Sequence, residues 1–488
     1  STLFPYTTLF RSIQNGAYTL ALAAIPSGQD TLLMAGDSDL WKCSLATGCL
    51  WRNTTNTATC RSARVAPYQH AVAWNAANPV AILIGNDSGL WRSIDAIGES
   101  GSVCDPTDAA HFQNLNGSLG SLAEVDNLSA SPATPYTLLT GLGANGISGV
   151  KNSSMAVSVW PQILDGEGGP VAIDPMDTTR WYANNQSGVA IHVCAQSSDC
   201  AAADFGITPV IGEPDVSNDG NTMAIPAAFL VDPLDHTQLL VATCRVWRGP
   251  SDGSAWTSAN AISSFLDGIS GKTSCNGDAL IQTLAAMPVG GNSEVLYAGM
   301  YGHANGGANR AGHVYRAVFK PGSDTPIWTD LTFNSVTNDS VGFNAQTLDV
   351  TSIAIDPHDA TGNTVYITIA GISSAGHAVA TVYVSADGGA HWVSEVSNLP
   401  SSPANAVVVD PQDASTIYVA TDAGVYSTRQ IGTCATGIAN CWSRFGTGLP
   451  PAPVTALSVV SAASAGNALV AGTYGRGVWM TSLWTTGI

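Results

Sequence analysis

Ile353-Ala-Ile-Asp356-Pro357-His-Asp359 is one of four copies of a phrase in which a short apolar run is followed by Asp-Pro-x-Asp and then by another apolar run. The other copies place their first aspartate at Asp174, Asp232 and Asp410. Asp232 follows Asp174 by 58 residues and Asp410 follows Asp356 by 54, whereas 124 residues separate Asp232 from Asp356. Because 124 is close to twice the shorter intervals, the phrase indicates a repeat array with one weakened copy in the middle.

The composition indicates a nearly all-β protein with a weakly charged surface. Only 11% of the residues are charged, and 36 acidic side chains outnumber 17 basic ones, which gives a formal net charge of −19. This negative balance argues against nucleic acid and anionic membranes as partners. Short runs rich in Val, Ile, Thr, Tyr and Trp recur between turn residues, without sustained helical periodicity. No apolar stretch approaches the roughly 18 residues of a membrane-spanning helix, so we predict no membrane insertion.

Each repeat is predicted to hold four short antiparallel strands. In the clearest unit they are expected at 406–409, 416–420 and 424–428, with a fourth beginning at Cys441. This pattern is typical of a β-propeller blade. About nine units are expected, opening near Tyr18, Gln69, Ser121, Gly169, Met223, Leu280, Asp349, Asn405 and Pro453. They form either one large ring or a seven-bladed ring plus the remnant of a second propeller, and the last unit ends after its third strand.

The ten cysteines predict disulfides and therefore an oxidising compartment. Three pairs are close in sequence and follow strand-like runs, as expected of a bond that closes a hairpin. A fourth bond is expected to tether two loops, and Cys60 and Cys104 remain as a pair by elimination. No Cys or His cluster has zinc-ligand spacing, so we predict neither a metal nor a cofactor. The predicted bonds are Cys43–Cys49, Cys194–Cys200, Cys434–Cys441 and Cys244–Cys275.

The first twelve residues do not fit the repeat pattern. Thr2–Ser12 reads as the in-frame translation of a widely used short-read sequencing adapter. We therefore treat residues 1–12 as an artefact and assign residues 13–488 to the repeat array. The natural start of the chain, with any signal peptide, is expected to be missing from this sequence, which suggests an assembled environmental origin.

Two further phrases carry a resemblance to a known superfamily. Ser385-Ala-Asp387-Gly-Gly389-Ala-His-Trp392 resembles the Asp-box, or BNR repeat, of sialidases, sortilin-type receptors and two-domain xyloglucanases. In such a hairpin the aspartate accepts hydrogen bonds from its own turn, glycines adopt positive φ, and the tryptophan packs between blades. Gly472–Trp479 resembles the closing phrase of bacterial Asp-box repeat proteins. The resemblance implies a secreted or cell-surface bacterial β-propeller.

Turns of an up-and-down blade alternate between its two ends, which gives the array two faces. The turn face holds the links between strands one and two and between strands three and four. The loop face holds the links between strands two and three and between one blade and the next. The Asp-Pro-x-Asp turns and the Asp-box fall on the turn face, where their recurrence fits a role in building turns. We expect the functional site on the loop face, because repeat proteins commonly place insertions on their binding face.

Candidate functional residues therefore come from the loop-face links. A Thr-Asp-x-Gly-Gly link supplies a catalytic aspartate in the xyloglucanases. Similar links here contain Asp87 and Asp422 but lack the second glycine, and a Gly-Asp-Ser-Asp link at the same place contains Asp37. Catalysis, turn capping and ligand contact stay open for Asp87 and Asp422, and Asp37 is a further catalytic candidate. Tyr474 and Arg476 suit a sugar ring or a carboxylate, unless Arg476 packs over an aromatic ring to close the array. The candidate ligand-binding residues are Glu213, Asp215, His303, Arg310, His377, Tyr474 and Arg476.

Two functions compete on this basis. The first is a binding module for extracellular polysaccharide or protein. The second is a glycoside hydrolase acting on a β-glucan such as xyloglucan, with an acid–base pair drawn from Asp37, Asp87, Asp422, Glu213 or Asp215. An enzyme needs two carboxyl groups roughly 5–10 Å apart in one cleft, so geometry separates the hypotheses. A sialidase is disfavoured, because the chain contains few arginines and no Phe-Arg-Ile-Pro-like strand.

Overall fold

The computed structural model describes most of the chain in a series of ranges. These are residues 18–27, 29–55, 65, 67–93, 112–115, 123–131, 137–143, 145–151, 160–194, 200, 204–206, 208–221, 223–266, 273–275, 280–302, 311–323, 325–373, 379–434, 440–462 and 466–487. The adapter-like segment and the Cys60–Cys104 pair lie outside the described residues and stay predictions. The chain divides into two compact units, one of residues 1–123 and 143–145 and one of residues 124–142 and 146–488.

The first unit holds two four-stranded antiparallel sheets. They are β1 (Ala21–Ser27), β2 (Asp30–Gly36), β3 (Leu40–Ser44) and β4 (Arg52–Asn53), followed by β5 (Gln69–Asn75), β6 (Asn78–Asn86), β7 (Gly89–Ser93) and β8 (Phe112–Asn114). Their first strands, β1 and β5, contact each other. Ile25 and Met34 from the first sheet pack with Ile82 and Ile84 from the second in one buried cluster. The two sheets are therefore stacked like neighbouring blades.

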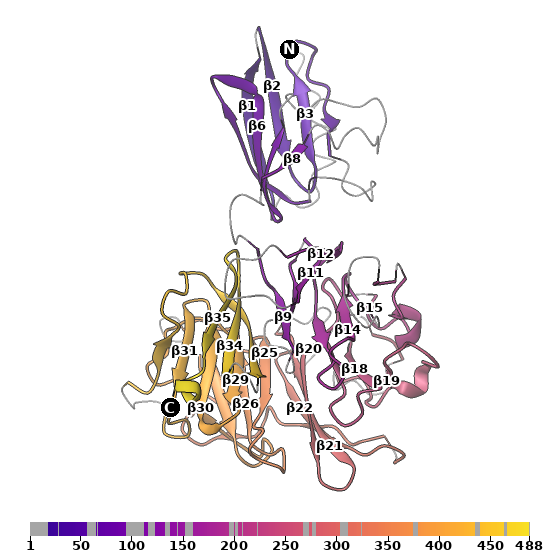
Figure 1. The fold of residues 1–488 in the computed structure, drawn as a ribbon, viewed down its shortest axis with the longest axis vertical. Helices are drawn as coiled ribbons and strands as arrows, with labels where there is room; N and C mark the ends of the chain where they lie inside the picture. Colours follow the sequence, from indigo (N-terminus) through magenta and orange to yellow (C-terminus); the bar gives the residue numbers. More distant parts are fainter. Residues whose placement is uncertain are drawn as a thin grey trace. The chain divides into compact units, whose positions relative to one another are not determined.

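The second unit holds seven sheets, here named blades 1 to 7 (Figure 1). Blade 1 is β9 (Asn127–Ala130), β10 (Leu138–Gly141), β11 (Ile147–Val150) and β12 (Gln162–Leu164); blade 2 is β13 (Val171–Ile173), β14 (Trp181–Asn184), β15 (Ala190–Cys194) and β16 (Ile211–Gly212); blade 3 is β17 (Phe229–Val231), β18 (Gln238–Ala242) and β19 (Val246–Pro250). Blade 4 is β20 (Ile281–Val289), β21 (Ser293–Met300), β22 (Val314–Phe319) and β23 (Thr329–Asp330).

The remaining blades follow the same order. Blade 5 is β25 (Val350–Ile355), β26 (Val365–Ile369), β27 (Val382–Ser385) and β28 (His391–Ser394), with β24 (Ser335–Val336) added parallel to β28; blade 6 is β29 (Ala404–Asp410), β30 (Asp413–Thr421), β31 (Gly424–Thr428) and β32 (Ser443–Phe445); blade 7 is β33 (Val454–Ala462), β34 (Gly466–Thr473) and β35 (Gly477–Ser482). The helical segments with assigned bounds are single 3₁₀ turns, η3 (Glu213–Val216), η4 (Ser258–Asn260) and η5 (Trp484–Gly487).

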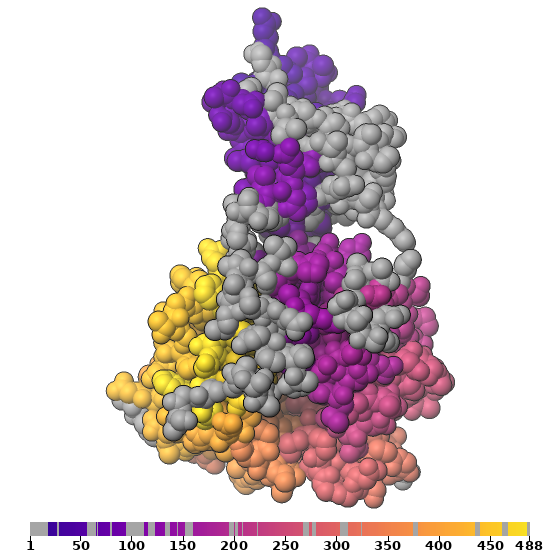
Figure 2. Space-filling view, viewed as in Figure 1, coloured from indigo at the N-terminus to yellow at the C-terminus, as the bar shows by residue number. Residues whose placement is uncertain are grey.

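The seven blades close into a ring. The first strand of each blade contacts the first strand of the next, from β9 through β13, β17, β20, β25 and β29 to β33, and β33 contacts β9 again. At the closure Val125 donates its backbone N–H to the Thr473 carbonyl at 3.0 Å, and the Thr455 hydroxyl donates to the Val125 carbonyl. In Figure 2 blade 7 is coloured yellow and blade 1 purple. The all-β propeller is thus confirmed, as seven blades in a ring preceded by two more.

The second strands of the blades are buried on both sides. Every residue of β26 is buried, as are seven consecutive residues of β21. A neighbouring blade covers each face of these strands, so their sequences are continuous apolar runs rather than alternating ones. The largest fully buried side chains include Trp181, Trp247 and Trp392. The core is consequently spread between successive blades instead of forming one central cluster.

The Asp-Pro-x-Asp turns connect first and second strands on the turn face. The first aspartate of each copy is buried, and its Oδ1 accepts the backbone N–H two residues later, for example at 2.9 Å from Met176 to Asp174 and at 2.7 Å from Leu234 to Asp232. Several of these carboxylates also reach across to other segments. His236 of blade 3 lies 3.1 Å from Asp174 of blade 2. The weakened copy is blade 4, whose first link carries no Asp-Pro.

The hairpin of the Asp-box-like phrase, Ser385–Trp392, joins β27 to β28. The Ser385 hydroxyl donates to Asp387 at 2.8 Å and accepts the Gly389 N–H at 2.8 Å, while Asp387 accepts the His391 N–H at 2.9 Å. Gly389 adopts a φ of 87°, which favours glycine. Trp392 is fully buried and donates its indole N–H to the Leu331 carbonyl after blade 4. The hairpin therefore orders its own turn and ties blade 5 to blade 4.

Replacing Ser385 with alanine is expected to destabilise the second unit by about 1–2 kcal/mol. The change leaves the Gly389 N–H without its acceptor inside a buried turn. Ser443→Ala, at an exposed position of β32, is the matched control and should change the free energy of unfolding by less than about 0.5 kcal/mol. Chemical denaturation followed by tryptophan fluorescence measures both. Equal effects of the two variants would contradict a structural role for the Ser385 hydroxyl.

Candidate functional site

Four disulfides are present among the described residues, and they join Cys43 to Cys49, Cys194 to Cys200, Cys244 to Cys275 and Cys434 to Cys441. The Cys434–Cys441 bond lies in the link between the third and fourth strands of blade 6, the position of the Ser385–Trp392 hairpin in blade 5. The Cys244–Cys275 bond lies on the loop face, where it joins the β18–β19 link to the segment that leads into β20. It restrains the loop-face surface of blade 3.

Glu213 and Asp215 organise the loop that connects blade 2 to blade 3. The Glu213 carboxylate accepts the Val189 N–H at 2.6 Å and the Gly220 N–H at 2.9 Å. Burial raises the pKa of Glu213, although these backbone donors stabilise its charged form. Asp215 accepts the Gly212 N–H at 2.8 Å and caps η3. Both carboxylates therefore hold the loop together, with Glu213 joining it to the β14–β15 link.

Arg245 is a loop-face residue that the sequence reasoning missed. Its Nε donates to Asp219 Oδ2 at 2.7 Å, and Asp219 is 3% exposed. The guanidinium carbon lies 4.5 Å from the ring centroid of Trp247 and 4.4 Å from that of Phe265. The signal available beforehand was weak: an arginine next to Cys244, in the link between strands two and three of an arginine-poor chain. Only folding brings Asp219 and Phe265, from two other links, to that side chain.

Blade 7 presents a hairpin at the loop face. Tyr474 is 47% exposed, and Arg476 is exposed and donates to the Gly475 carbonyl at 2.7 Å. Trp479, 39% exposed, donates its indole N–H to the Arg476 carbonyl at 2.8 Å. Beside the hairpin a shallow apolar groove, partly open to solvent, lies between blades 6 and 7. Its lining includes Trp479, Phe445 and Leu449.

Asp422 lies nearby in the β30–β31 link. It accepts the Asn405 amide at 2.8 Å, and the same amide reaches the Val454 carbonyl at 2.9 Å. Asn405 belongs to blade 6 and Val454 begins blade 7, so Asp422 orients a side chain that joins the two blades. This contact favours the structural alternative for Asp422. The candidates His303, Arg310 and His377 lie outside the described residues.

In the first unit Asp37 and Asp87 lie in the links between the second and third strands of the two sheets. Asp37 is 2% exposed and accepts the Thr19 hydroxyl at 3.3 Å. Asp87 lies 2.5 Å from His70 Nε2 and accepts the Tyr18 hydroxyl at 3.1 Å. The Tyr18 ring meets the His70 ring edge-on at a centroid distance of 5.2 Å. The sequence reasoning named the two carboxylates, but it named Tyr18 only as the opening of a unit and did not name His70. His70 lies inside β5 and Tyr18 precedes β1, so neither stands in the links that were searched.

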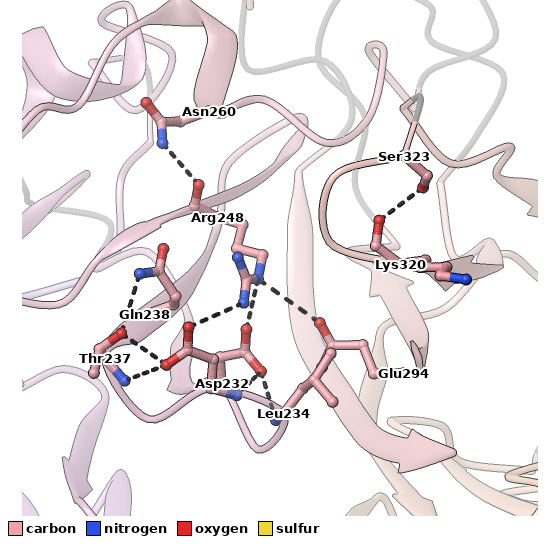
Figure 3. Close-up of polar contacts among 10 residues, drawn as sticks. Asp232, Leu234, Thr237, Gln238, Arg248, Asn260, Glu294, Lys320 and Ser323 are labelled. Atoms are coloured by element: carbon pink, nitrogen blue, oxygen red, sulfur yellow. Dashed lines mark hydrogen bonds and ion pairs between the residues drawn. The ribbon is translucent and has the colours of Figure 1, made fainter. Parts of the chain in front are cut away.

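A buried carboxyl group with a strongly raised pKa lies on the turn face, away from every candidate. Glu294, at the start of β21, and Asp232 are both fully buried (Figure 3). Arg248 Nε lies 2.6 Å from Asp232 and 3.9 Å from Glu294. Burial, followed by the charge of Asp232, raises the pKa of Glu294 to about 8. A carboxyl group with a raised pKa beside a second carboxyl group is a feature of acid–base sites, but both groups are fully buried between blades 3 and 4, where a substrate has no access.

Comparisons with known proteins identify no family. No protein-family model matches the chain, and no curated protein matches it. Among solved structures, the β-propeller domain of Cps50 (Swd1) from Myceliophteria thermophila is similar over 72% of this chain and 92% of that one, with 11% sequence identity and a TM-score of 0.39. The propeller assignment for this chain rests on its own sheets and ring contacts.

Two further searches of the described residues gave negative results. None of the described His, Cys, Asp and Glu side chains form a group of three or more that is placed to hold a metal ion. In the same part of the chain, no helix is long and apolar enough to cross a membrane.

Proposed function

We propose that this propeller is an extracellular binding module that holds a polysaccharide on its loop face. The observation that carries the proposal is the β34–β35 hairpin, which exposes Tyr474 and Trp479 beside an apolar groove and places Arg476 between them in sequence. Exposed aromatic rings suit the apolar faces of sugars, and an arginine suits their oxygen substituents. Phe333, 74% exposed after β23, adds a further aromatic ring to the same face. The disulfides support an oxidising, extracellular setting.

A hydrolase has less support from the same residues. Each described candidate carboxylate is engaged in a local contact: Asp422 with Asn405, Asp215 with the backbone of η3, and Asp87 with His70. Glu213 and Asp37 are likewise engaged, with backbone amides and with the Thr19 hydroxyl. These contacts fit side chains that shape loops. Protein remains the second ligand class, and the binding experiment below separates it from polysaccharide.

Binding to a panel of immobilised neutral and acidic polysaccharides tests the proposal with the full chain. We expect retention by at least one polysaccharide, no release of new reducing ends, and a loss of about tenfold or more in affinity for Tyr474→Ala/Trp479→Ala. Ile327→Ala is the matched control, because Ile327 is 85% exposed in the β22–β23 link on the turn face. Retention by none of the polysaccharides would overturn the proposal, and new reducing ends would replace it with hydrolysis.

A further inference from the structure

The Arg245 side chain is held in one orientation by groups from three links. Asp219 accepts a hydrogen bond from Nε at 2.7 Å. The aromatic rings of Trp247 and Phe265 contact the guanidinium. Within the described residues, Asp219 is the one hydrogen-bond acceptor on this guanidinium. The side chain is nevertheless 16% exposed, so part of it reaches solvent beyond these partners. Among the residues that the structure describes, none accepts a hydrogen bond from Nη1 or Nη2, and we take these two nitrogens as the donors for a ligand.

The surrounding loops are built to keep that orientation. The Thr243 hydroxyl accepts both the Arg245 N–H at 3.2 Å and the Trp247 indole N–H at 3.0 Å. The adjoining residue, Cys244, is disulfide-bonded to Cys275. The Leu266 N–H donates to the Cys244 carbonyl at 3.1 Å, which positions the segment carrying Phe265. A preorganised side chain loses little conformational entropy when it binds, so it favours affinity.

The Nη groups of a planar guanidinium can donate two parallel N–H bonds to the two oxygens of a carboxylate. The chain carries a net charge of −19, which disfavours non-specific attraction of polyanions. Binding of an acidic ligand must therefore come from a specific contact. Arg245 is placed to supply it on the loop face, the face of the proposed polysaccharide site.

We propose that Arg245 is the anchor for a carboxylate on the ligand, and that the polysaccharide bound by this propeller carries uronic acids. This inference rests on the proposed function and specifies its ligand class. The aromatic hairpin of blade 7 and Arg245 of blade 3 then serve as separate contacts along one chain of sugars. A long polymer reaches both, whereas a short oligosaccharide engages Arg245 alone.

Calorimetric titration of the full chain with an oligogalacturonate and with its methyl ester tests the inference. We expect the acid to bind at least tenfold more tightly than the ester, and Arg245→Lys to remove this preference, because lysine keeps the charge but loses the planar pair of donors. Arg429→Lys, an exposed arginine on the turn face, is the matched control and should bind like the parent. A sulfated polysaccharide forms a second arm, with weaker binding expected for its tetrahedral anion.

The outcomes separate this inference from the function on which it rests. Equal affinity for the acid and its ester in the parent protein would overturn the uronate assignment, and this comparison holds even if Arg245→Lys folds poorly. Tighter binding of the sulfated polymer would overturn the choice of carboxylate. Retention of neutral polysaccharides alone would overturn the inference and leave the binding function in place. Retention of no polysaccharide at all would overturn both.

Discussion

Replacing Arg248 with alanine is expected to lower the free energy of unfolding of the second unit by about 3–5 kcal/mol, the largest effect of any single change considered for this fold. Arg248 bonds to the fully buried Asp232 through Nε at 2.6 Å and approaches Glu294 of blade 4. It also lies 5.0 Å from the Phe319 ring centroid. Without it, the Asp232 carboxylate would remain buried without a countercharge, and the contact between blades 3 and 4 would lose its polar centre.

Chemical denaturation with tryptophan fluorescence measures this effect. Arg429→Ala is the control, because Arg429 is exposed on the same face and should change stability by less than about 0.5 kcal/mol. Arg248→Ala combined with Asp232→Asn should recover part of the loss, since the buried charge is removed together with its partner. A loss below about 1 kcal/mol for Arg248→Ala would show that the Asp232 charge finds another partner or is neutralised at little cost.

The second large effect is a decline in stability from about pH 5 to pH 8, caused by Glu294 and Glu395. Burial and then the Asp232 charge raise the pKa of Glu294 to about 8, and burial raises the pKa of Glu395 to about 7. Both exceed the value of 4.5 for an exposed glutamate. Between 4.5 and the raised values, the folded chain keeps a proton that the unfolded chain releases. Each pH unit in that window therefore lowers the free energy of unfolding by up to about 1.4 kcal/mol for each group.

Glutamine substitutions isolate this contribution. Glu294→Gln and Glu395→Gln should each match the parent near pH 5 and exceed its stability near pH 8 by on the order of 2–3 kcal/mol, because a neutral amide cannot lose a proton. The control is Glu167→Gln, at an exposed position, which should keep the full pH dependence. Unfolding curves at pH 5, 6, 7 and 8 give the slopes. A parent whose stability rises over this range would contradict buried, protonated glutamates.

Local features of the blades were accessible from the sequence because they depend on neighbouring residues. The predicted openings near Gln69, Gly169 and Asn405 fall within two residues of the first residues of β5, β13 and β29. An Asp-Pro turn satisfies its own backbone through an aspartate a few atoms away, so the phrase marks its strand ends wherever it occurs. The start of blade 1 was predicted less accurately. Its first strand was expected to open near Ser121, but β9 begins at Asn127.

Long-range contacts were not accessible in this way. Glu294 follows a link that has no Asp-Pro phrase, so the sequence gives no sign that it differs from other residues at the start of a strand. Only the fold brings Asp232 and Arg248 of the preceding blade close to it. The sequence likewise does not distinguish Arg245 from the other arginines, because its contacts with Asp219 and Phe265 form only in the folded chain. For the candidate carboxylates, the sequence suggested available side chains that the fold engages in hydrogen bonds. Asp37, Asp87 and Asp422 look like free acids in a link, yet hydrogen bonds to Thr19, His70 and Asn405 occupy them in the fold.

The sequence by itself determined that this protein is an array of four-stranded units punctuated by Asp-Pro-x-Asp, because both the strand period and the turn chemistry are local. The tertiary structure decided how many units share a ring and which side chains meet. Nine units fit one ring or two equally well in sequence, and the contact of β33 with β9, more than 300 residues apart in the chain, selects seven. Ring closure depends on the angle accumulated from blade to blade, which no single repeat contains.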